Sequence, residues 1–219
     1  SNGTKMTEEW LTKIRPHLDW LGLSIDASND EMHALMGRGL KGEIASGFSR
    51  HLERSKEVWQ IARELGYGLK LNTVVTSVNA DDDMSELVAN LKPHRWKVFR
   101  VLRIEGENDG RVEPLLVSQE QFEDYMVRHR RSLQDFEGTH IVAEDNEDML
   151  GTYAMIDPKG RAYTNKNGRY LYSNKSCIEV GFSDAWNEVV TGFSETRFSD
   201  RGGDWDWKKA EWNLPLPVL

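Results

Sequence analysis

The sequence contains almost no cysteine, because Cys177 is the only one among 219 residues. A single thiol excludes an internal disulfide framework and fits a reducing compartment, so we expect a cytoplasmic protein. It also excludes an iron–sulfur cluster held wholly by this chain, since such clusters need several thiolates. No histidine lies near Cys177 in the sequence, and we predict a small buried apolar side chain beside a strand rather than a nucleophile.

Two further features are missing. No apolar run is long enough to span a bilayer, and no basic stretch precedes an apolar segment as in a signal peptide. The 28 basic and 36 acidic residues give a net charge of −8, without the basic footprint of a general nucleic-acid binder. We therefore expect no nucleic-acid partner and no membrane segment in this chain, while a local basic pocket for a small polyanion stays open.

The first half of the sequence alternates strands with helices. Apolar runs predict strands at 20–26, 69–75 and 96–104, and amphipathic spacing predicts helices at 48–65 and 81–91. A capping-box pattern at Ser28–Glu31 predicts one more short helix. Strands that alternate with helices predict an α/β fold with a parallel sheet, although three strands do not close a barrel.

The second half has a different pattern, and we place the domain boundary between residues 117 and 118. A capping box at Ser118–Gln121 predicts a helix to about Arg131, and a Pro-Lys-Gly turn predicts a hairpin over 153–163. Residues 168–172 and 178–182 are predicted to be extended, and Ser183 to begin a short helix. The segment 118–219 is therefore expected to be a C-terminal α+β extension.

Polar side chains interrupt the predicted strands, where ligands bind in parallel α/β folds. Lys70 and Asn72 share one face of their strand, and Arg95 and Lys97 share one face of theirs. Buried cations on adjacent strands need an anion, and lysine and arginine together suit phosphate oxygens. This pattern favours a triphosphate site, and the alternative is that these cations pair with carboxylates of the protein.

Two more arginines lie beside glycines. Arg38 is flanked by Gly37 and Gly39, and Arg201 precedes Gly202 and Gly203, where a backbone could approach a ligand closely. Arg201 is a candidate for a terminal phosphate, and the alternative is a tight turn with a solvated side chain.

The motifs resemble those of the viperin family of antiviral radical S-adenosylmethionine enzymes. The segment 95–99, Arg-Trp-Lys-Val-Phe, followed by 104–108, Ile-Glu-Gly-Glu-Asn, resembles the family's signature region. Further short matches follow in the expected order over nearly the whole chain: Ser1–Gly3, Leu23–Asp26, Gly37–Gly39, Lys70–Asn72, Asp82–Met84, Phe122–Glu123, Arg128–His129, Tyr153, Lys175–Ser176 and Arg201–Gly203. The stretch 136–150 matches least.

This resemblance implies a partial (β/α) barrel of the TIM-like, radical S-adenosylmethionine type, with residues 1–117 as its C-terminal part and residues 118–219 closing the nucleotide site. It implies a 4Fe–4S cluster, bound by a CxxxCxxC motif, that cleaves S-adenosylmethionine to a 5′-deoxyadenosyl radical. That radical takes hydrogen from C4′ of CTP or UTP, and dehydration yields a 3′-deoxy-3′,4′-didehydro nucleotide. The partners implied are an electron donor and iron–sulfur assembly machinery.

The resemblance also implies roles for individual residues. Ser24 and Arg38 are expected to hold the methionine carboxylate of S-adenosylmethionine. Tyr153 is expected to return hydrogen to the substrate radical, although from the sequence alone it is equally a hairpin core residue. Lys175 is expected to add a phosphate contact. The expected triphosphate ligands are Lys70, Asn72, Arg95, Lys97 and Arg201.

Three features depart from the family pattern. The chain has no CxxxCxxC and no membrane-binding amphipathic helix, and we expect the cluster ligands upstream of Ser1. It ends in Pro215–Leu219 rather than in the tryptophan that the cluster-loading machinery of vertebrates reads, so the resemblance does not carry that mode of cluster delivery over. A cluster-free nucleotide-binding regulatory module is the alternative to an enzyme, and a phosphate-handling α/β enzyme with a chance likeness is a third hypothesis.

Overall fold

The computed structural model describes residues 1–206, so the chain end at Pro215–Leu219, noted in the sequence analysis, lies outside the described residues. The chain forms two compact units. The first unit comprises 1–100 and 117–143, and the second unit comprises 101–116 and 144–206. The predicted domain boundary between residues 117 and 118 stays a prediction.

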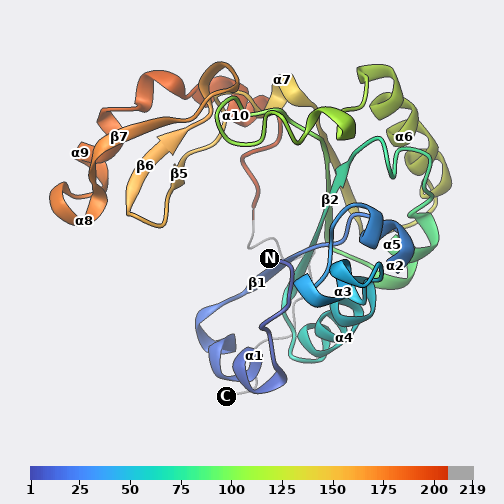
Figure 1. The fold of residues 1–219 in the computed structure, drawn as a ribbon. Coiled ribbons are helices and arrows are strands. Elements are labelled where there is room, and N and C mark those ends of the chain that lie inside the picture. The colour runs from blue at the N-terminus through green and yellow to red at the C-terminus, as the bar shows by residue number, and fades with distance from the viewer. Residues whose placement is uncertain (207–219) are drawn as a thin grey trace. The chain divides into compact units, whose positions relative to one another are not determined.

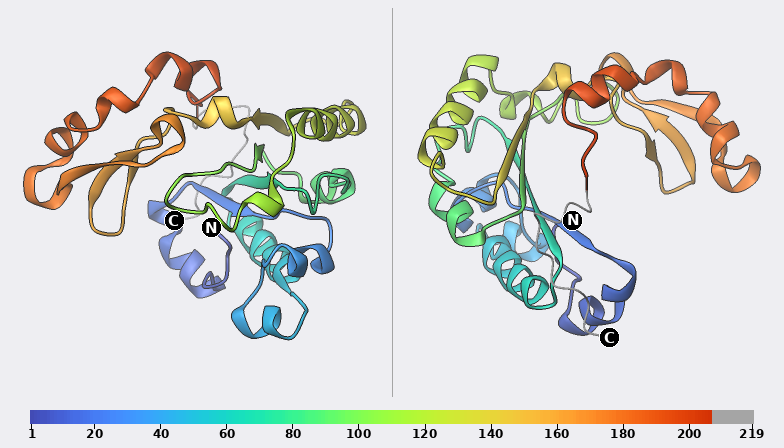
Figure 2. Two further views of the ribbon diagram at one scale, coloured as in Figure 1. Left: turned by 45° about the horizontal axis from the view of Figure 1, so that its top comes forward. Right: turned by 180° about the vertical axis from the view of Figure 1, so that it is seen from behind.

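The first unit contains a sheet with the strand order β1-β2-β3-β4. Pairing is parallel between β1 and β2 and between β2 and β3, as the alternating sequence predicts. Figures 1 and 2 show α4, α5 and α6 on the same side of this sheet. The elements of this part are α1 (Glu8–Ile14), β1 (Trp20–Ser24), α2 (Asp30–Leu35), α3 (Lys41–Ala45), α4 (His51–Glu64), β2 (Gly68–Val75), α5 (Ser85–Leu91), β3 (Arg95–Arg100), α6 (Gln119–Ser132) and β4 (His140–Glu144), with a 3₁₀ turn at Arg15–His17.

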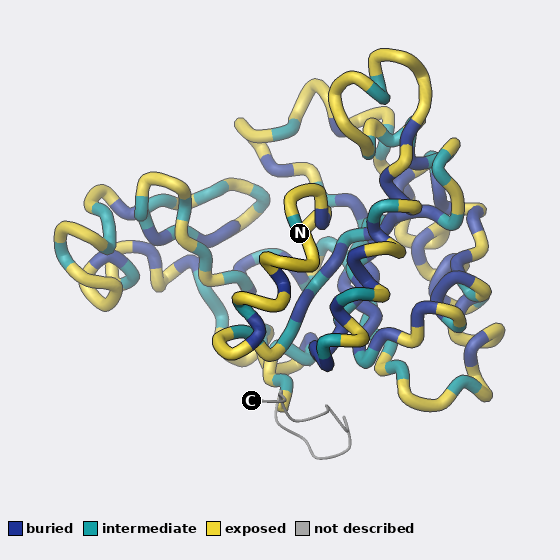
Figure 3. The backbone as a smooth tube through the Cα atoms, turned by 90° about the horizontal axis from the view of Figure 1, so that it is seen from below, coloured by how far each residue is buried: buried dark blue, intermediate teal, exposed yellow. Residues whose placement is uncertain are grey.

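The core of the first unit lies between the helices and one face of the sheet. Leu23, Leu71 and Trp96 occupy one row of the paired strands and are fully buried. Trp59 of α4 packs among the buried residues and donates from its indole nitrogen to the carbonyl of Leu91 at 2.8 Å. Burial of each large apolar side chain contributes about 1.5–3 kcal/mol, so this face holds the unit together. Figure 3 shows where buried and exposed residues lie along the backbone.

Three predicted details of the first unit are wrong. Asn29, rather than Ser28, caps α2, because the Asn29 side chain accepts from the amide of Met32. Ser28 instead donates through its amide and its hydroxyl to the carboxylate of Asp82, at 2.7 and 2.6 Å. The third predicted strand ends at Arg100 rather than at residue 104, and the structure contains helix α3, which was not predicted.

The second unit contains an antiparallel sheet of three strands in the order β5-β6-β7. The predicted hairpin is confirmed, because the amide of Gly160 donates to the carbonyl of Asp157 at 2.9 Å and β5 pairs with β6. Helix α9 packs against β6 and β7 (Figure 1). The elements are α7 (Asn146–Met149), β5 (Met155–Ile156), β6 (Arg161–Thr164), β7 (Leu171–Ser176), α8 (Cys177–Val180), α9 (Phe182–Asn187) and α10 (Glu195–Asp200), with 3₁₀ turns at Glu113–Leu115, Lys166–Gly168 and Val190–Gly192.

The predicted extended segment at 178–182 is wrong. Ser176 and Glu179 form a capping box that begins α8, and α9 follows after Gly181. Cys177 lies at the start of α8 and packs against the cluster of Ala162, Ala185 and Val189, but it is half-buried rather than buried as predicted. Mixed α/β architecture with a small C-terminal α+β part is therefore confirmed. Within residues 1–206 no barrel is closed.

Candidate functional site

The sheet register brings five of the predicted site residues onto one face of the first unit. Ser24 is paired with Asn72, and Asn72 with Lys97, so these three form one row across β1, β2 and β3. Lys70 is paired with Arg95 in the neighbouring row, two residues earlier along each strand. The core residues occupy the opposite face, because side chains alternate along a strand.

The polar rows are largely shielded from water. Arg95 and Lys97 are only 3% and 6% exposed, and Lys97 Nζ lies 5.3 Å from the centre of the Phe99 ring. The side-chain oxygen of Asn72 is buried and has no hydrogen-bond partner among the described residues. A buried polar atom without a partner is costly, which marks this row as a place where a ligand would complete the hydrogen bonding.

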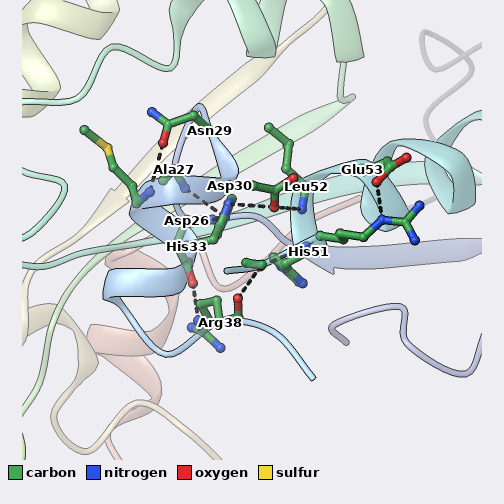
Figure 4. Close-up of polar contacts among 12 residues, drawn as sticks. Asp26, Ala27, Asn29, Asp30, His33, Arg38, His51, Leu52 and Glu53 are labelled. Carbon is green, nitrogen blue, oxygen red and sulfur yellow. Dashed lines mark hydrogen bonds and ion pairs between the residues drawn. The ribbon is translucent and has the colours of Figure 1, made fainter. Parts of the chain in front are cut away.

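Arg38 is held by a carboxylate that the sequence analysis did not single out. Asp26 comes two residues after β1 and is fully buried, and its Oδ2 lies 2.5 Å from Arg38 Nε (Figure 4). The amide of Val74 donates to Asp26 Oδ1 at 2.8 Å. Burial raises the pKa of the Asp26 carboxyl, and the Arg38 guanidinium opposes that rise. The Arg38 side chain is still 39% exposed, so it is both oriented and accessible to a ligand.

Two histidines fix the loop that carries Arg38. The buried His33 accepts through Nε2 from the amides of Asp26 and Ala27, both at 3.2 Å, and its carbonyl accepts from the Arg38 amide at 2.7 Å. Burial lowers the pKa of His33 to about 4, with His51 adding to the effect and Asp30 opposing it. A neutral imidazole is what this geometry requires, because both backbone groups are donors.

His51 connects the same loop to the end of β1. Its Nε2 lies 2.8 Å from the carbonyl of Ser24, so this nitrogen carries the proton. The rings of His33 and His51 meet edge to face with their centres 4.9 Å apart. Figure 4 shows the two side chains, His33 on α2 and His51 on α4. The backbone at Ser24 and the side chain of Arg38 are therefore positioned by one connected polar network.

The second unit contains a compact group around Tyr153. The Tyr153 hydroxyl donates to Glu144 Oε2 at 2.5 Å, and Arg201 donates to Glu144 Oε1 at 2.5 Å and to the carbonyl of Thr152 at 2.8 Å. The Arg201 guanidinium carbon lies 4.3 Å from the centre of the Tyr153 ring. Arg201 and Glu144 are both buried, and they form an ion pair with each other. Lys175 is exposed on β7.

Sequence similarity connects this chain to curated proteins, although not to a family model. No protein-family model matches the chain. The S-adenosylmethionine-dependent nucleotide dehydratase of Flammeovirga pacifica is 37% identical over 210 residues, which cover 95% of this chain and 67% of that protein. The chain belongs to the S-adenosylmethionine-dependent nucleotide dehydratase family. This is the family, also called viperin, that the sequence motifs resemble.

Other relatives in the dehydratase family extend beyond this chain. The protein of the same name from Lacinutrix mariniflava is 34% identical over 94% of this chain, and the matched residues cover only 41% of that protein. S-adenosylmethionine-dependent nucleotide dehydratase RSAD2 of Danio rerio is 36% identical over 98% of this chain, and the matched residues cover 57% of that protein. The chain thus spans between about two fifths and two thirds of these relatives.

The residues present fit one of the two groups that the dehydratase family implies. The oriented and accessible Arg38 fits the carboxylate of S-adenosylmethionine. An iron–sulfur cluster finds no ligand set here, since the described part of the chain holds no group of three or more His, Cys, Asp or Glu side chains placed for a metal ion. Among the described helices, none is long and apolar enough to cross a membrane.

Asp26, His33 and Glu144 are the residues that sequence reasoning missed. Asp26 had a signal, because it ends the apolar run of the first strand, where parallel folds place ligand-binding groups. His33 and Glu144 had none, since their partners lie on other elements.

Proposed function

We propose that the complete protein is a nucleotide dehydratase that acts on a pyrimidine nucleoside triphosphate, CTP or UTP, and releases the 3′-deoxy-3′,4′-didehydro nucleotide for antiviral defence. The observation that carries the proposal is the row of Ser24, Asn72 and Lys97 beside Lys70 and Arg95, in a chain of this family. When bound, S-adenosylmethionine supplies the 5′-deoxyadenosyl radical after reduction by a cluster held outside this chain. An electron donor and iron–sulfur assembly machinery are the partners proposed.

The first unit would supply the two binding functions. Arg38, oriented by Asp26, would bind the methionine carboxylate, with Ser24 adding a hydrogen bond. Lys70, Asn72, Arg95 and Lys97 would bind the triphosphate, where lysine supplies point charges and arginine a planar fork. The radical S-adenosylmethionine partial barrel is proposed on the same basis, with three parallel strands and their helices as its described part.

The second unit would supply the residue that completes the reaction. Tyr153 is the proposed donor because its O–H group can give up an electron and a proton when it reduces the substrate radical, whereas phenylalanine at this position could not. Arg201 and Lys175 remain proposed phosphate ligands. For Arg201 the donor to phosphate would be Nε, which is buried and has no hydrogen-bond partner among the described residues, while Nη1 keeps its contact with Glu144.

An anaerobic assay of the complete polypeptide tests this function. The protein would receive reductant, S-adenosylmethionine and, in turn, CTP, UTP, GTP or ATP, and mass spectrometry would follow 5′-deoxyadenosine and dehydrated nucleotide. Formation of both products with CTP or UTP supports the proposal. A loaded cluster that yields no 5′-deoxyadenosine with either nucleotide contradicts it.

A cluster-free nucleotide-binding module is the second candidate. Such a module would keep the cations of β2 and β3 but would not need Ser24 or Tyr153, and both residues are present. It predicts that the complete polypeptide binds nucleoside triphosphate but takes up no iron and sulfide during reconstitution. Stoichiometric uptake of four irons per chain would exclude it.

A further inference from the structure

Glu144 is a buried carboxylate at the end of β4 that joins two side chains of the second unit. One oxygen accepts the hydrogen bond from the Tyr153 hydroxyl and the other accepts the charge-assisted bond from Arg201. Glu144 is fully buried and the Arg201 side chain is 4% exposed. Burial of an ion pair is costly, so a pair retained here calls for an explanation beyond stability.

The phenolic proton of Tyr153 points toward this carboxylate. An O···O distance of 2.5 Å is typical of a hydroxyl that donates to a charged oxygen. The Arg201 guanidinium lies over the Tyr153 ring at 4.3 Å, where it would repel a positively charged tyrosine radical. Oxidation of Tyr153 therefore needs loss of the proton at the same time, and Glu144 is the base in contact with that proton.

We propose that Glu144 positions Tyr153 and accepts its phenolic proton when Tyr153 reduces the substrate radical. This inference rests on the proposed function. One electron passes from Tyr153 to the substrate radical, and the proton passes to Glu144 Oε2, which leaves a neutral tyrosyl radical and a carboxylic acid. The electron allows the 3′-hydroxyl to leave as hydroxide, which takes a proton from solvent and becomes water. A one-electron reductant and the proton on Glu144 then restore the phenol.

A second tyrosine in the same unit provides a matched control. Tyr172 donates to Glu107 Oε1 at 3.0 Å, and the Arg161 guanidinium carbon lies 4.3 Å from the centre of the Tyr172 ring. This group has the same three residue types as the Glu144 group, a tyrosine, a glutamate and an arginine, with the same contact of arginine over the tyrosine ring. Glu107, however, is exposed to water. Glu107→Gln therefore removes an equivalent carboxylate without disturbing the buried group.

The test compares Glu144→Gln with Glu107→Gln in the complete, cluster-loaded polypeptide. We expect Glu144→Gln to form 5′-deoxyadenosine but about 100-fold less dehydrated nucleotide per 5′-deoxyadenosine, the lower range for loss of a general base. Glu107→Gln should keep the wild-type ratio. A wild-type ratio in Glu144→Gln, or an equal fall in both variants, would overturn the proposal.

Two further measurements keep the result interpretable. Glu144→Asp keeps the charge beside Arg201 and draws the carboxylate away from Tyr153, so a folded Glu144→Asp protein should show the same fall in the ratio. A low-field proton resonance from the Tyr153 hydroxyl, recorded without nucleotide, should vanish in Tyr153→Phe and shift in Glu144→Gln. Without that resonance the inference about Glu144 fails. A wild-type protein that shows the resonance but makes no 5′-deoxyadenosine refutes the proposed function instead.

Discussion

Protonation of His33 should destabilise the first unit. Its Nε2 accepts two backbone hydrogen bonds, from Asp26 and Ala27, and a proton on that nitrogen would face two donors. Burial holds the pKa of His33 at about 4 in the folded chain, against 6.5 for the free side chain. Between these values the unfolded chain binds a proton that the folded chain does not. The stabilisation is therefore complete above pH 6.5 and is lost as the pH falls toward 4.

The magnitude follows from the size of that shift. About 2.5 pH units at about 1.36 kcal/mol each give a limit of about 3 kcal/mol. Roughly 2 kcal/mol of this should be lost between pH 7.5 and pH 5, where the unfolded imidazole is almost fully protonated and the folded one is not.

The assay is urea-induced unfolding of wild type and His33→Gln at these two pH values. Glutamine removes the titration and keeps an acceptor oxygen, so the wild type should lose about 2 kcal/mol more than the variant on acidification. The exposed His17 provides the control, and His17→Gln should follow the wild type. An equal pH dependence in wild type and His33→Gln would refute the account of His33.

The remaining predictions concern binding, turnover and stability. Lys97→Ala should weaken nucleoside triphosphate binding at least about tenfold, from loss of a charge-assisted contact, and leave S-adenosylmethionine binding unchanged in calorimetry of the complete polypeptide; equal losses would contradict the assignment. Tyr153→Phe should keep nucleotide affinity and lower the yield of dehydrated nucleotide per 5′-deoxyadenosine, and an unchanged yield would exclude the donor role. Asp26→Asn should weaken S-adenosylmethionine binding roughly 5- to 10-fold, a modest effect because the Arg38 side chain is 39% exposed; a variant that binds as tightly as wild type would show that Arg38 needs no orientation by Asp26. Arg201→Ala should cost about 3–5 kcal/mol of unfolding free energy because it leaves Glu144 charged and buried, and a loss below about 1 kcal/mol in thermal unfolding would contradict this.

The parts of the fold that sequence reasoning predicted depend on local signals. Strand β2 combines alternation with flanking glycine, and α6 begins at a capping box formed by Ser118 and Gln121. Strand β4 was missed because its residues are mostly half-buried and carry no such signal. Helix α3 was missed because the side chain of its N-cap residue, Leu40, cannot accept a hydrogen bond. Glu43 does accept from the Leu40 amide, and it pairs with Arg54 of α4, which no local pattern shows.

One local signal was present but not used. Ser176 and Glu179 satisfy the capping-box pattern that correctly located α6, yet the segment after them was predicted to be extended. The apolar side chains of Ile178 and Phe182 suggested a strand, although both are largely exposed in the folded chain. Capping chemistry therefore outweighed hydrophobic pattern at this position.

In the candidate site, too, the residues with a local sequence pattern were predicted, and those that depend on distant partners were not. The cations on β2 and β3 were predicted from two-residue alternation, and the register places them side by side. Their triphosphate role stays a prediction. Asp26 and Glu144 act through partners that are distant in the sequence, Arg38 and Val74 for the first and Arg201 for the second. Such pairings arise only when the chain folds, so no spacing rule identifies them.

The order of the strands has a consequence for how the first unit folds. Only α5 separates β2 from β3, whereas α2, α3 and α4 separate β1 from β2. The shorter connection loses less chain entropy on closure, so the β2–β3 ladder should form first. The lysine and arginine side chains of these two strands would then come together before Ser24 arrives on β1. Early in folding the nascent sheet therefore concentrates positive charge, and phosphate-containing ions in the surrounding solution should speed that step.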